Sequence, residues 1–213
     1  MIITKLKTNT LHELRQSVKK GFIIHTLIFL CVLQFTLQNF TQLDAVRPLL
    51  FPSNLSSLFE THQYWRLITP VFIHFTFSHL ISNLFLFWYF ARVINTYSPI
   101  VFVSLIFVAA LVGDLGEFLL VDEKFGGISG IDFALFGFIF CYQKIRPEGE
   151  LSIDPLVSSV VILFLLLTAT DWFGQYAFYS HLIGCIIGGI FGFILATKDK
   201  HLYKKTSPFK NRE

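Results

Sequence analysis

A serine and a histidine stand in apolar stretches of this sequence, where polar side chains are costly to bury. Ser129 lies in the run Gly-Gly-Ile-Ser-Gly at 126–130, and these glycines permit a tight backbone and the close approach of another group. His181 opens a later apolar stretch. A serine hydroxyl becomes a nucleophile when a neighbouring imidazole takes its proton, which imidazole can do near neutral pH. The two residues therefore predict nucleophilic catalysis, with Ser129 as the nucleophile and His181 as its base.

Polar donors for such a reaction stand in a further apolar stretch. His79 and Asn83 are four residues apart, which places them on one face of a helix, and His74 lies a little over one turn above. The tetrahedral intermediate of peptide cleavage carries an oxyanion that needs preorganised donors. We expect the Ser129 backbone N–H, the His79 ring and the Asn83 amide to supply them. Asn83 could instead join helices by a hydrogen bond, and for His74 an interfacial place and a role in substrate or water access are both open.

The amino-acid composition predicts that these residues lie in a membrane protein. Of the 213 residues, 54% are hydrophobic and 15% are charged, against roughly 25% charged in an ordinary soluble domain. The apolar residues form long blocks separated by short polar stretches, as in lipid-facing helices. The net charge of +3 comes from basic residues at the edges of these blocks, so no nucleic-acid partner is expected. The expected surrounding is the lipid bilayer.

Six apolar stretches approach the roughly twenty residues that a bilayer requires, so we expect an all-α, polytopic membrane protein with six transmembrane helices. The first stretch has no small-residue cleavage site and is expected to be retained, while the short fourth stretch is expected to begin below the membrane surface. The expected helices cover 21–40, 71–94, 99–121, 126–142, 155–172 and 177–197. The domain is expected at 21–197, with an outer loop at about 41–70, an N-terminal cytoplasmic segment at 1–20 and a basic cytoplasmic tail at 198–213.

The basic residues predict the orientation of these helices. One side of the expected bundle holds 14 of the 17 Lys and Arg residues, and the other side holds only Arg47, Arg66 and Lys124. The positive-inside rule therefore predicts that both termini are cytoplasmic and that the loop at 41–70 faces out.

Small residues on the fourth and sixth expected helices predict that Ser129 and His181 come into contact. In this orientation both lie roughly 5 to 7 Å below the outer boundary, because each stands a few residues into its helix at about 1.5 Å rise per residue. Small side chains let helix backbones approach closely in membranes. We expect the fourth and sixth helices to pack closely and to bring the hydroxyl within hydrogen-bond reach of the imidazole. Their small residues are Gly130, Ala134 and Gly137 on the fourth and Gly184, Gly188 and Gly192 on the sixth.

No disulfide or metal site is expected. Cys31, Cys141 and Cys185 each lie in an apolar block without a metal-ligand spacing, so we interpret them as small core residues. A metal site built from His74, His79 and His181 would lack the H-E-x-x-H spacing of membrane metalloproteases.

Taken together, these motifs resemble the rhomboid family of intramembrane serine proteases. Order, spacing and placement agree over about residues 60 to 195. The matching residues are Trp65, Arg66, His74, His79, Asn83, Gly127, Ile128, Ser129, Gly130, His181, Gly184 and Gly188. The resemblance implies a six-helix rhomboid-like bundle with a Ser129/His181 dyad, and no catalytic carboxylate, metal or cofactor. It implies an endopeptidase whose substrates are transmembrane proteins, cut near the outer membrane face. We expect a multi-pass protein of a bacterial-type plasma (inner) membrane, of undetermined oligomeric state.

Two positions depart from the family pattern. Phe133 stands where the family often has a tyrosine stacked on the catalytic histidine, and it can stack but has no hydroxyl. Asp132 stands where relatives often place an apolar side chain, and our hypothesis is that it pairs with a neighbouring polar group and raises local hydration. For Trp65 and Arg66 we favour anchoring of the outer loop at the lipid headgroups over contact with substrate.

Two alternatives remain open at this point. Asp114, Glu117, Asp132 and Asp171 in or near the expected helices suggest a proton-coupled transporter, although Asp171 and Glu117 are expected to be near enough to the helix ends to be solvated. There is no sign of paired broken helices or inverted repeats. The other alternative is a catalytically silent rhomboid-like protein that binds transmembrane clients, but such a protein usually lacks the serine or the histidine.

Overall fold

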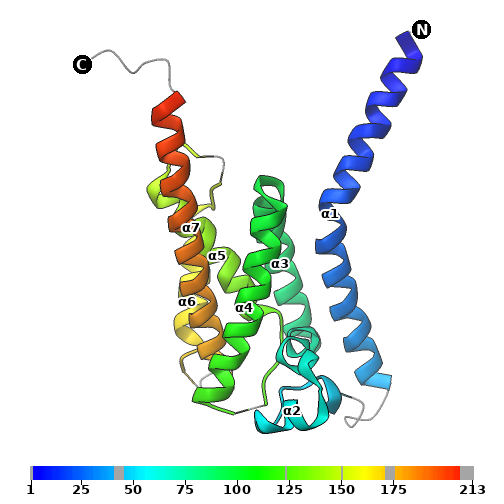
Figure 1. The fold of residues 1–213 in the computed structure, drawn as a ribbon, viewed down its shortest axis with the longest axis vertical. Coiled ribbons are helices and arrows are strands. Elements are labelled where there is room, and N and C mark those ends of the chain that lie inside the picture. Colours follow the sequence, from blue (N-terminus) through cyan, green and yellow to red (C-terminus); the bar gives the residue numbers. More distant parts are fainter. Residues whose placement is uncertain (1, 41–45, 123, 150, 171–175, 207–213) are drawn as a thin grey trace.

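The computed structural model describes residues 2–40, 46–122, 124–149, 151–170 and 176–206, and within these ranges the chain folds into helices without a strand (Figure 1). The long helices are α1 (Ile2–Phe40), α3 (Phe77–Tyr97), α4 (Pro99–Leu120), α5 (Ser129–Ile145), α6 (Pro155–Leu167) and α7 (Phe178–Thr206). The connection from α1 to α3 holds three short 3-10 helices, η2 (Arg47–Leu49), η3 (Tyr64–Leu67) and η4 (Thr69–Phe72), and the short helix α2 (Ser56–Thr61). The all-helical expectation is confirmed.

Four helices within the described residues are long and apolar enough to cross a membrane, namely Gly21–Phe40 of α1, α3, α4 and Phe178–Lys200 of α7. Helix α6 is apolar but has only 13 residues, and α5 has 17. Large apolar side chains such as Phe29, Phe107 and Phe193 are exposed on these helices, as a lipid-facing surface requires. The crossing of the membrane by six helices stays a prediction.

Helices α3 and α5 begin later than the hydropathy of the sequence predicts. Helix α3 begins at Phe77 and not at 71, because Thr76 acts as its N-cap and its hydroxyl accepts the backbone N–H of His79 at 3.1 Å. Helix α5 begins at Ser129 and not at 126, and Gly127 before it has a φ of 120°, which a helix cannot contain. The glycine-rich run is thus a loop that ends inside the bundle (Figure 1).

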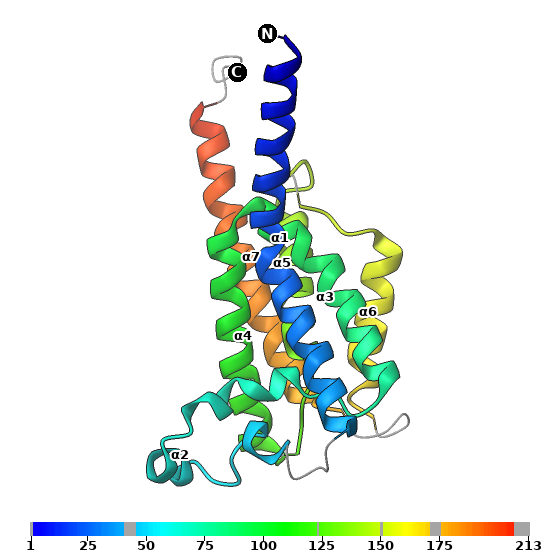
Figure 2. The ribbon, with the colours of Figure 1, turned by 90° about the vertical axis from the view of Figure 1, so that its right-hand side faces the viewer.

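Helices α1 and α7 both continue past the predicted apolar spans, into residues 2–20 and 198–206. Polar residues such as Lys, Glu and Gln are good helix formers, so the end of an apolar stretch need not end a helix. The N-terminal end of α1 and the C-terminal end of α7 lie at the same end of the bundle (Figure 1). The connection that holds α2 lies at the opposite end (Figure 2).

Helices α5 and α7 form the most extensive helix pair of the bundle. A Cβ atom added to Gly184 would lie 2.2 Å from the carbonyl oxygen of Gly130, and one added to Gly188 would lie 1.9 Å from that of Ala134. A Cβ atom on Gly192 would likewise lie 2.3 Å from the carbonyl oxygen of Phe138. The predicted close packing through small residues is therefore confirmed.

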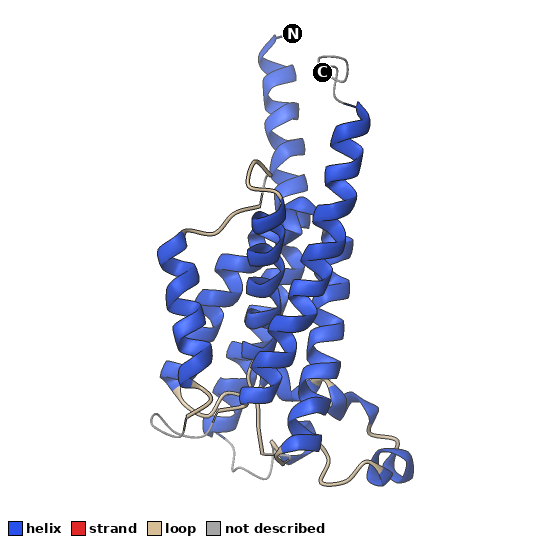
Figure 3. Cartoon of the chain, turned by 90° about the vertical axis from the view of Figure 1, so that its left-hand side faces the viewer, coloured by secondary structure: helices blue, strands red, loops and turns tan. Residues whose placement is uncertain are grey.

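Helix α6 lies at the margin of the bundle in two opposite views (Figures 2 and 3). It makes few contacts with α5 and α7, and half of its Leu, Val, Ile and Phe side chains, including Leu156, Leu163 and Leu166, are exposed. Helix α6 is therefore loosely packed against α5 and α7.

Candidate active site

The side chains of Ser129 and His181 touch in the interior of the bundle. The Ser129 Oγ lies 2.8 Å from the His181 Nε2, although the residues are 52 positions apart. Both side chains are buried, with 7% and 2% of their surface exposed. Ser129 is the first residue of α5 and His181 lies in the first turn of α7, so the close packing of these helices brings the two groups together.

The second ring nitrogen of His181 has its own partner. His181 Nδ1 lies 3.3 Å from the Oγ1 of Thr168, the residue that follows α6. The Thr168 hydroxyl donates its proton to the carbonyl of Leu165 at 2.7 Å, so towards the imidazole it is an acceptor. This arrangement favours the tautomer with the proton on Nδ1 and leaves Nε2 free to accept the Ser129 O–H. Sequence reasoning missed Thr168, and its only signal is a polar residue at the end of an apolar stretch.

The ring of Phe133 packs against His181, with the ring centroids 4.7 Å apart and the planes tilted by 36°. Phe133 also stacks with Phe164 of α6, and their ring centroids are 6.2 Å apart. The aromatic contact expected at this position is therefore present. It restrains the imidazole without offering a hydroxyl.

His79 and Asn83 approach the backbone just before Ser129. A Cβ atom on Gly127 would lie 2.8 Å from the His79 Nε2 and 3.2 Å from the Asn83 Nδ2. Asn83 is buried, and its Nδ2 has no hydrogen-bond partner among the described residues. The backbone N–H of Ser129 stands at the start of α5, where such groups lack intrahelical partners and the helix dipole is positive. The His79 ring and the Asn83 amide thus lie against the backbone that leads into Ser129, and Asn83 and Ser129 line one small cavity.

His74 lies in the segment before α3, so its predicted place on that helix is wrong. The ring is fully buried and sits 5.0 Å from the His79 ring, and its Nδ1 lies 3.3 Å from the Phe72 carbonyl oxygen. The Gln38 amide of α1 donates a hydrogen bond to the His74 carbonyl. Burial, aided by the neighbouring His79 and opposed by the Phe72 carbonyl, lowers the pKa of His74 to about 4. His74 is thus a neutral ring buried behind His79 and not a group exposed at an interface.

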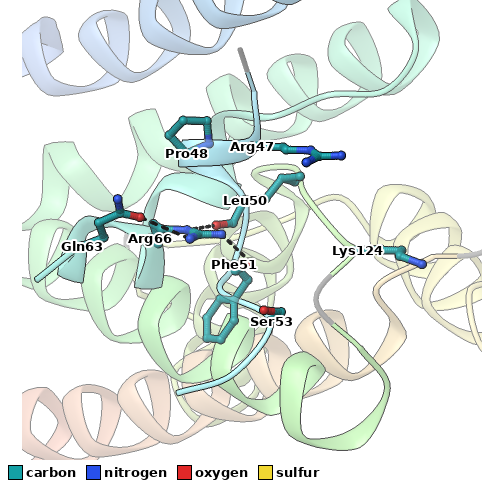
Figure 4. Close-up of a pocket in the computed structure, with 8 residues that line it drawn as sticks. All are labelled: Arg47, Pro48, Leu50, Phe51, Ser53, Gln63, Arg66 and Lys124. Carbon is teal, nitrogen blue, oxygen red and sulfur yellow. Dashed lines mark hydrogen bonds between the residues drawn. The ribbon is translucent and has the colours of Figure 1, made fainter. Parts of the chain in front are cut away.

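Trp65 and Arg66 lie in the loop before α3, where both bind backbone carbonyls. The Arg66 guanidinium donates to the carbonyls of Leu50 and Phe51 at 2.7 and 3.2 Å, and to the side chain of Gln63 at 3.2 Å (Figure 4). The Trp65 indole donates to the Pro48 carbonyl at 3.1 Å. These contacts join separate parts of the loop to one another. The anchoring of the loop at the lipid headgroups stays a prediction.

The acidic residues differ from the expectations drawn from the sequence. Glu117 is only 3% exposed, so the expectation of a solvated position is wrong, and its carboxylate accepts the Ser180 backbone N–H at 2.9 Å. Asp132 has no hydrogen-bond partner on either oxygen within the described residues, so the predicted pairing with a polar neighbour is also wrong. Asp114 is buried as well, and its Oδ2 lacks a partner in the same ranges. Asp171 lies outside the described residues.

Fold and site together define a helical membrane protein with a serine–histidine pair in its interior. The family model of the Rhomboid domain matches residues 61–198, more than half of the sequence, and the chain belongs to the rhomboid family. The predicted resemblance is therefore confirmed.

Curated relatives agree with this family. The chain is 31% identical over 136 residues to Rhomboid protease GlpG of Yersinia enterocolitica, an alignment that covers 62% of this chain and 48% of that protein. It is 27% identical over 196 residues to Rhomboid protease GlpG of Pectobacterium atrosepticum, covering 89% and 66%. The protein of the same name from Yersinia pestis is 28% identical over 179 residues, covering 81% and 62%. The chain thus spans about half to two thirds of the length of these relatives.

Proposed function

We propose that the protein is an intramembrane serine endopeptidase that cleaves transmembrane-helix substrates near the outer membrane face. The contact of 2.8 Å between Ser129 Oγ and His181 Nε2, buried among apolar helices, carries this proposal. Membership of the rhomboid family and the relatives named as rhomboid proteases support it.

In the first step the Ser129 oxygen attacks the carbonyl carbon of the scissile peptide bond, and the His181 Nε2 takes the hydroxyl proton. The carbonyl oxygen becomes an oxyanion, which the Asn83 Nδ2, the His79 ring and the Ser129 backbone N–H stabilise. The C–N bond then breaks, and His181 returns the proton to the leaving amine. An ester on Ser129 remains.

In the second step a water molecule attacks this ester while His181 again acts as the base, and the serine hydroxyl is restored. Thr168 is a positioning residue in both steps, since its oxygen holds the Nδ1–H of His181. The chemistry uses neither a metal nor a cofactor.

The proposal includes six membrane crossings by α1, α3, α4, α5, α6 and α7, with both termini in the cytoplasm of a bacterial-type cell. The common end of α1 and α7 in Figure 1 and the 14 of 17 basic residues counted on that side support this topology. The site then lies nearer the outer face, because α5 and α7 enter from that side.

Cleavage of a model transmembrane substrate by the protein reconstituted in liposomes tests the proposal. We expect Ser129→Ala and His181→Ala each to abolish cleavage while expression and thermal stability stay close to wild type. Ser159→Ala is the matched control, because Ser159 is exposed on α6 and should leave the rate unchanged. Undiminished cleavage by Ser129→Ala or by His181→Ala would contradict the mechanism.

A further inference from the structure

Asp132 is a buried acid three residues after Ser129 on α5. Its side chain is 2% exposed, and neither carboxyl oxygen has a hydrogen-bond partner among the described residues. Buried polar groups are nearly always hydrogen-bonded, and an unpaired one destabilises the fold. Most of the neighbouring positions of α5 bury apolar side chains, so packing alone gives no reason for an acid here.

The acid lines a small cavity that also contains the reactive groups. Its polar walls are Ser129, Asp132 and Asn83, and Nδ2 of Asn83 is likewise unpartnered. Its apolar walls come from α3, α5 and α6 and comprise Leu86, Phe90, Phe133, Val161 and Phe164. The cavity thus brings together the nucleophile with a donor and an acid that have no hydrogen-bond partner in the described part of the chain.

The size of the cavity limits what it can hold. Its volume is about 10 Å³, at the lower limit of what one water molecule requires. A hydroxyl group matches that size, whereas an extended basic or amide side chain does not. The walls from α6 belong to a helix that makes few contacts with α5 and α7, so a small side chain can enter with little rearrangement of the core.

We propose that this cavity is a substrate subsite, and that Asp132 is the specificity-determining residue that selects a hydroxyl-bearing side chain, serine or threonine, flanking the scissile bond. The inference rests on the proposed function. Three residues of helix rise by about 4.5 Å, and an extended substrate advances by about 3.3 to 3.6 Å per residue. A residue beside the bond that Ser129 attacks therefore lies within reach of the Asp132 carboxyl.

A hydroxyl suits this acid in either protonation state. It donates to an ionised carboxylate, and it can also accept from a protonated one. An apolar side chain in the same place would leave the buried acid unpaired, and sites of this kind discriminate strongly against the analogue that lacks the polar group. We expect a preference of at least about tenfold in kcat/KM.

Isosteric substrate pairs test the subsite. A model transmembrane substrate is prepared with threonine or valine at each position from four residues before to three residues after its mapped cleavage bond, and kcat/KM is measured with the full chain in liposomes. Wild type should prefer threonine by at least about tenfold at one position. Asp132→Val should lose or reverse that preference there and nowhere else, and Asp132→Asn should keep part of it because its amide oxygen still accepts.

Asp114→Asn is the matched control. Asp114 is also a buried acid with an unpartnered oxygen, but it lies on α4 and does not line the cavity, so its substitution should leave the threonine preference unchanged. Equal kcat/KM for threonine and valine at every position in wild type would overturn the inference. So would an unchanged preference in Asp132→Val, or an equal slowing of both substrates, which would assign Asp132 to water binding or folding. Absence of any cleavage by wild type would remove the proposed function itself, and the subsite with it.

Discussion

The carboxylate of Glu117 on α4 accepts the backbone N–H of Ser180 in the first turn of α7, at 2.9 Å and one residue before His181. The N–H groups of a first helical turn lack intrahelical partners, and the positive end of the helix dipole favours a negative group. Glu117 therefore caps α7 from a neighbouring helix and holds the start of the helix that carries the imidazole.

Glu117→Ala should lower both stability and cleavage. Losing a cap costs about 0.5–2 kcal/mol, and a buried hydrogen bond to a charged group is worth about 1.5–3 kcal/mol. We expect a reduced Tm and, well below that Tm, a lower kcat with little change in KM. Glu117→Gln should recover part of both, because its oxygen still accepts the Ser180 N–H. A Tm and kcat equal to wild type in Glu117→Ala would show that the contact has no positioning role.

Thr168→Val should slow the chemical step without loosening the fold. Valine keeps the shape of threonine but lacks the oxygen that faces the His181 Nδ1, so the tautomer that leaves Nε2 as acceptor is no longer favoured. Loss of a neutral hydrogen bond predicts a fall in kcat of about 2- to 10-fold. Thr168→Ser keeps the oxygen and should stay near wild type. Equal kcat values for the valine and serine variants would exclude this role of Thr168.

The close packing of α5 against α7 could be predicted from the sequence, because it depends on the spacing of residues within one helix. The spacing of Gly184, Gly188 and Gly192 predicts one small face on α7, and that face does lie against the backbone of α5. The spacing of the residues alone predicts such a face, because positions four apart lie on one side of a helix. The meeting of Ser129 with His181 follows from it.

Contacts between distant segments could not be predicted in this way. Thr168 contacts His181 across 13 positions, and Glu117 contacts Ser180 across 63 positions. Neither contact leaves a periodic signal in the sequence. The start of α3 at Phe77, in contrast, could have been predicted from the sequence. Threonine is a preferred N-cap residue, and Thr76 caps this helix, but a hydropathy pattern does not take N-caps into account.

Gly188→Ala should destabilise the bundle, whereas Gly189→Ala should not. The added Cβ on Gly188 would lie 1.9 Å from the Ala134 carbonyl oxygen, so the α5 and α7 backbones would have to separate. Overpacking of this kind costs about 1–3 kcal/mol. A Cβ on the neighbouring Gly189 meets nothing within 4 Å. Thermal unfolding in detergent should give a lower Tm for the first variant only, and equal Tm values would contradict the close packing.

Asn83→Leu should reduce turnover and leave the fold intact. The Nδ2 of Asn83 has no partner within the described residues, so its removal breaks no such bond while it takes away a donor for the oxyanion. Loss of one such donor lowers kcat by about 10²- to 10³-fold. The Tm should be equal to wild type or higher, because an unpaired buried amide is removed. A variant with wild-type kcat and a raised KM would argue for substrate binding instead.

Covalent labelling of Ser129 tests whether its hydroxyl is a nucleophile activated by His181. The reconstituted protein is treated with a fluorophosphonate serine-hydrolase probe, and the labelled residue is identified by peptide mass spectrometry. We expect one adduct, on Ser129, that is absent in Ser129→Ala and strongly reduced in His181→Ala, since the hydroxyl then lacks its base. Failure of wild type to react, or equal labelling of wild type and Ser129→Ala, would contradict this expectation.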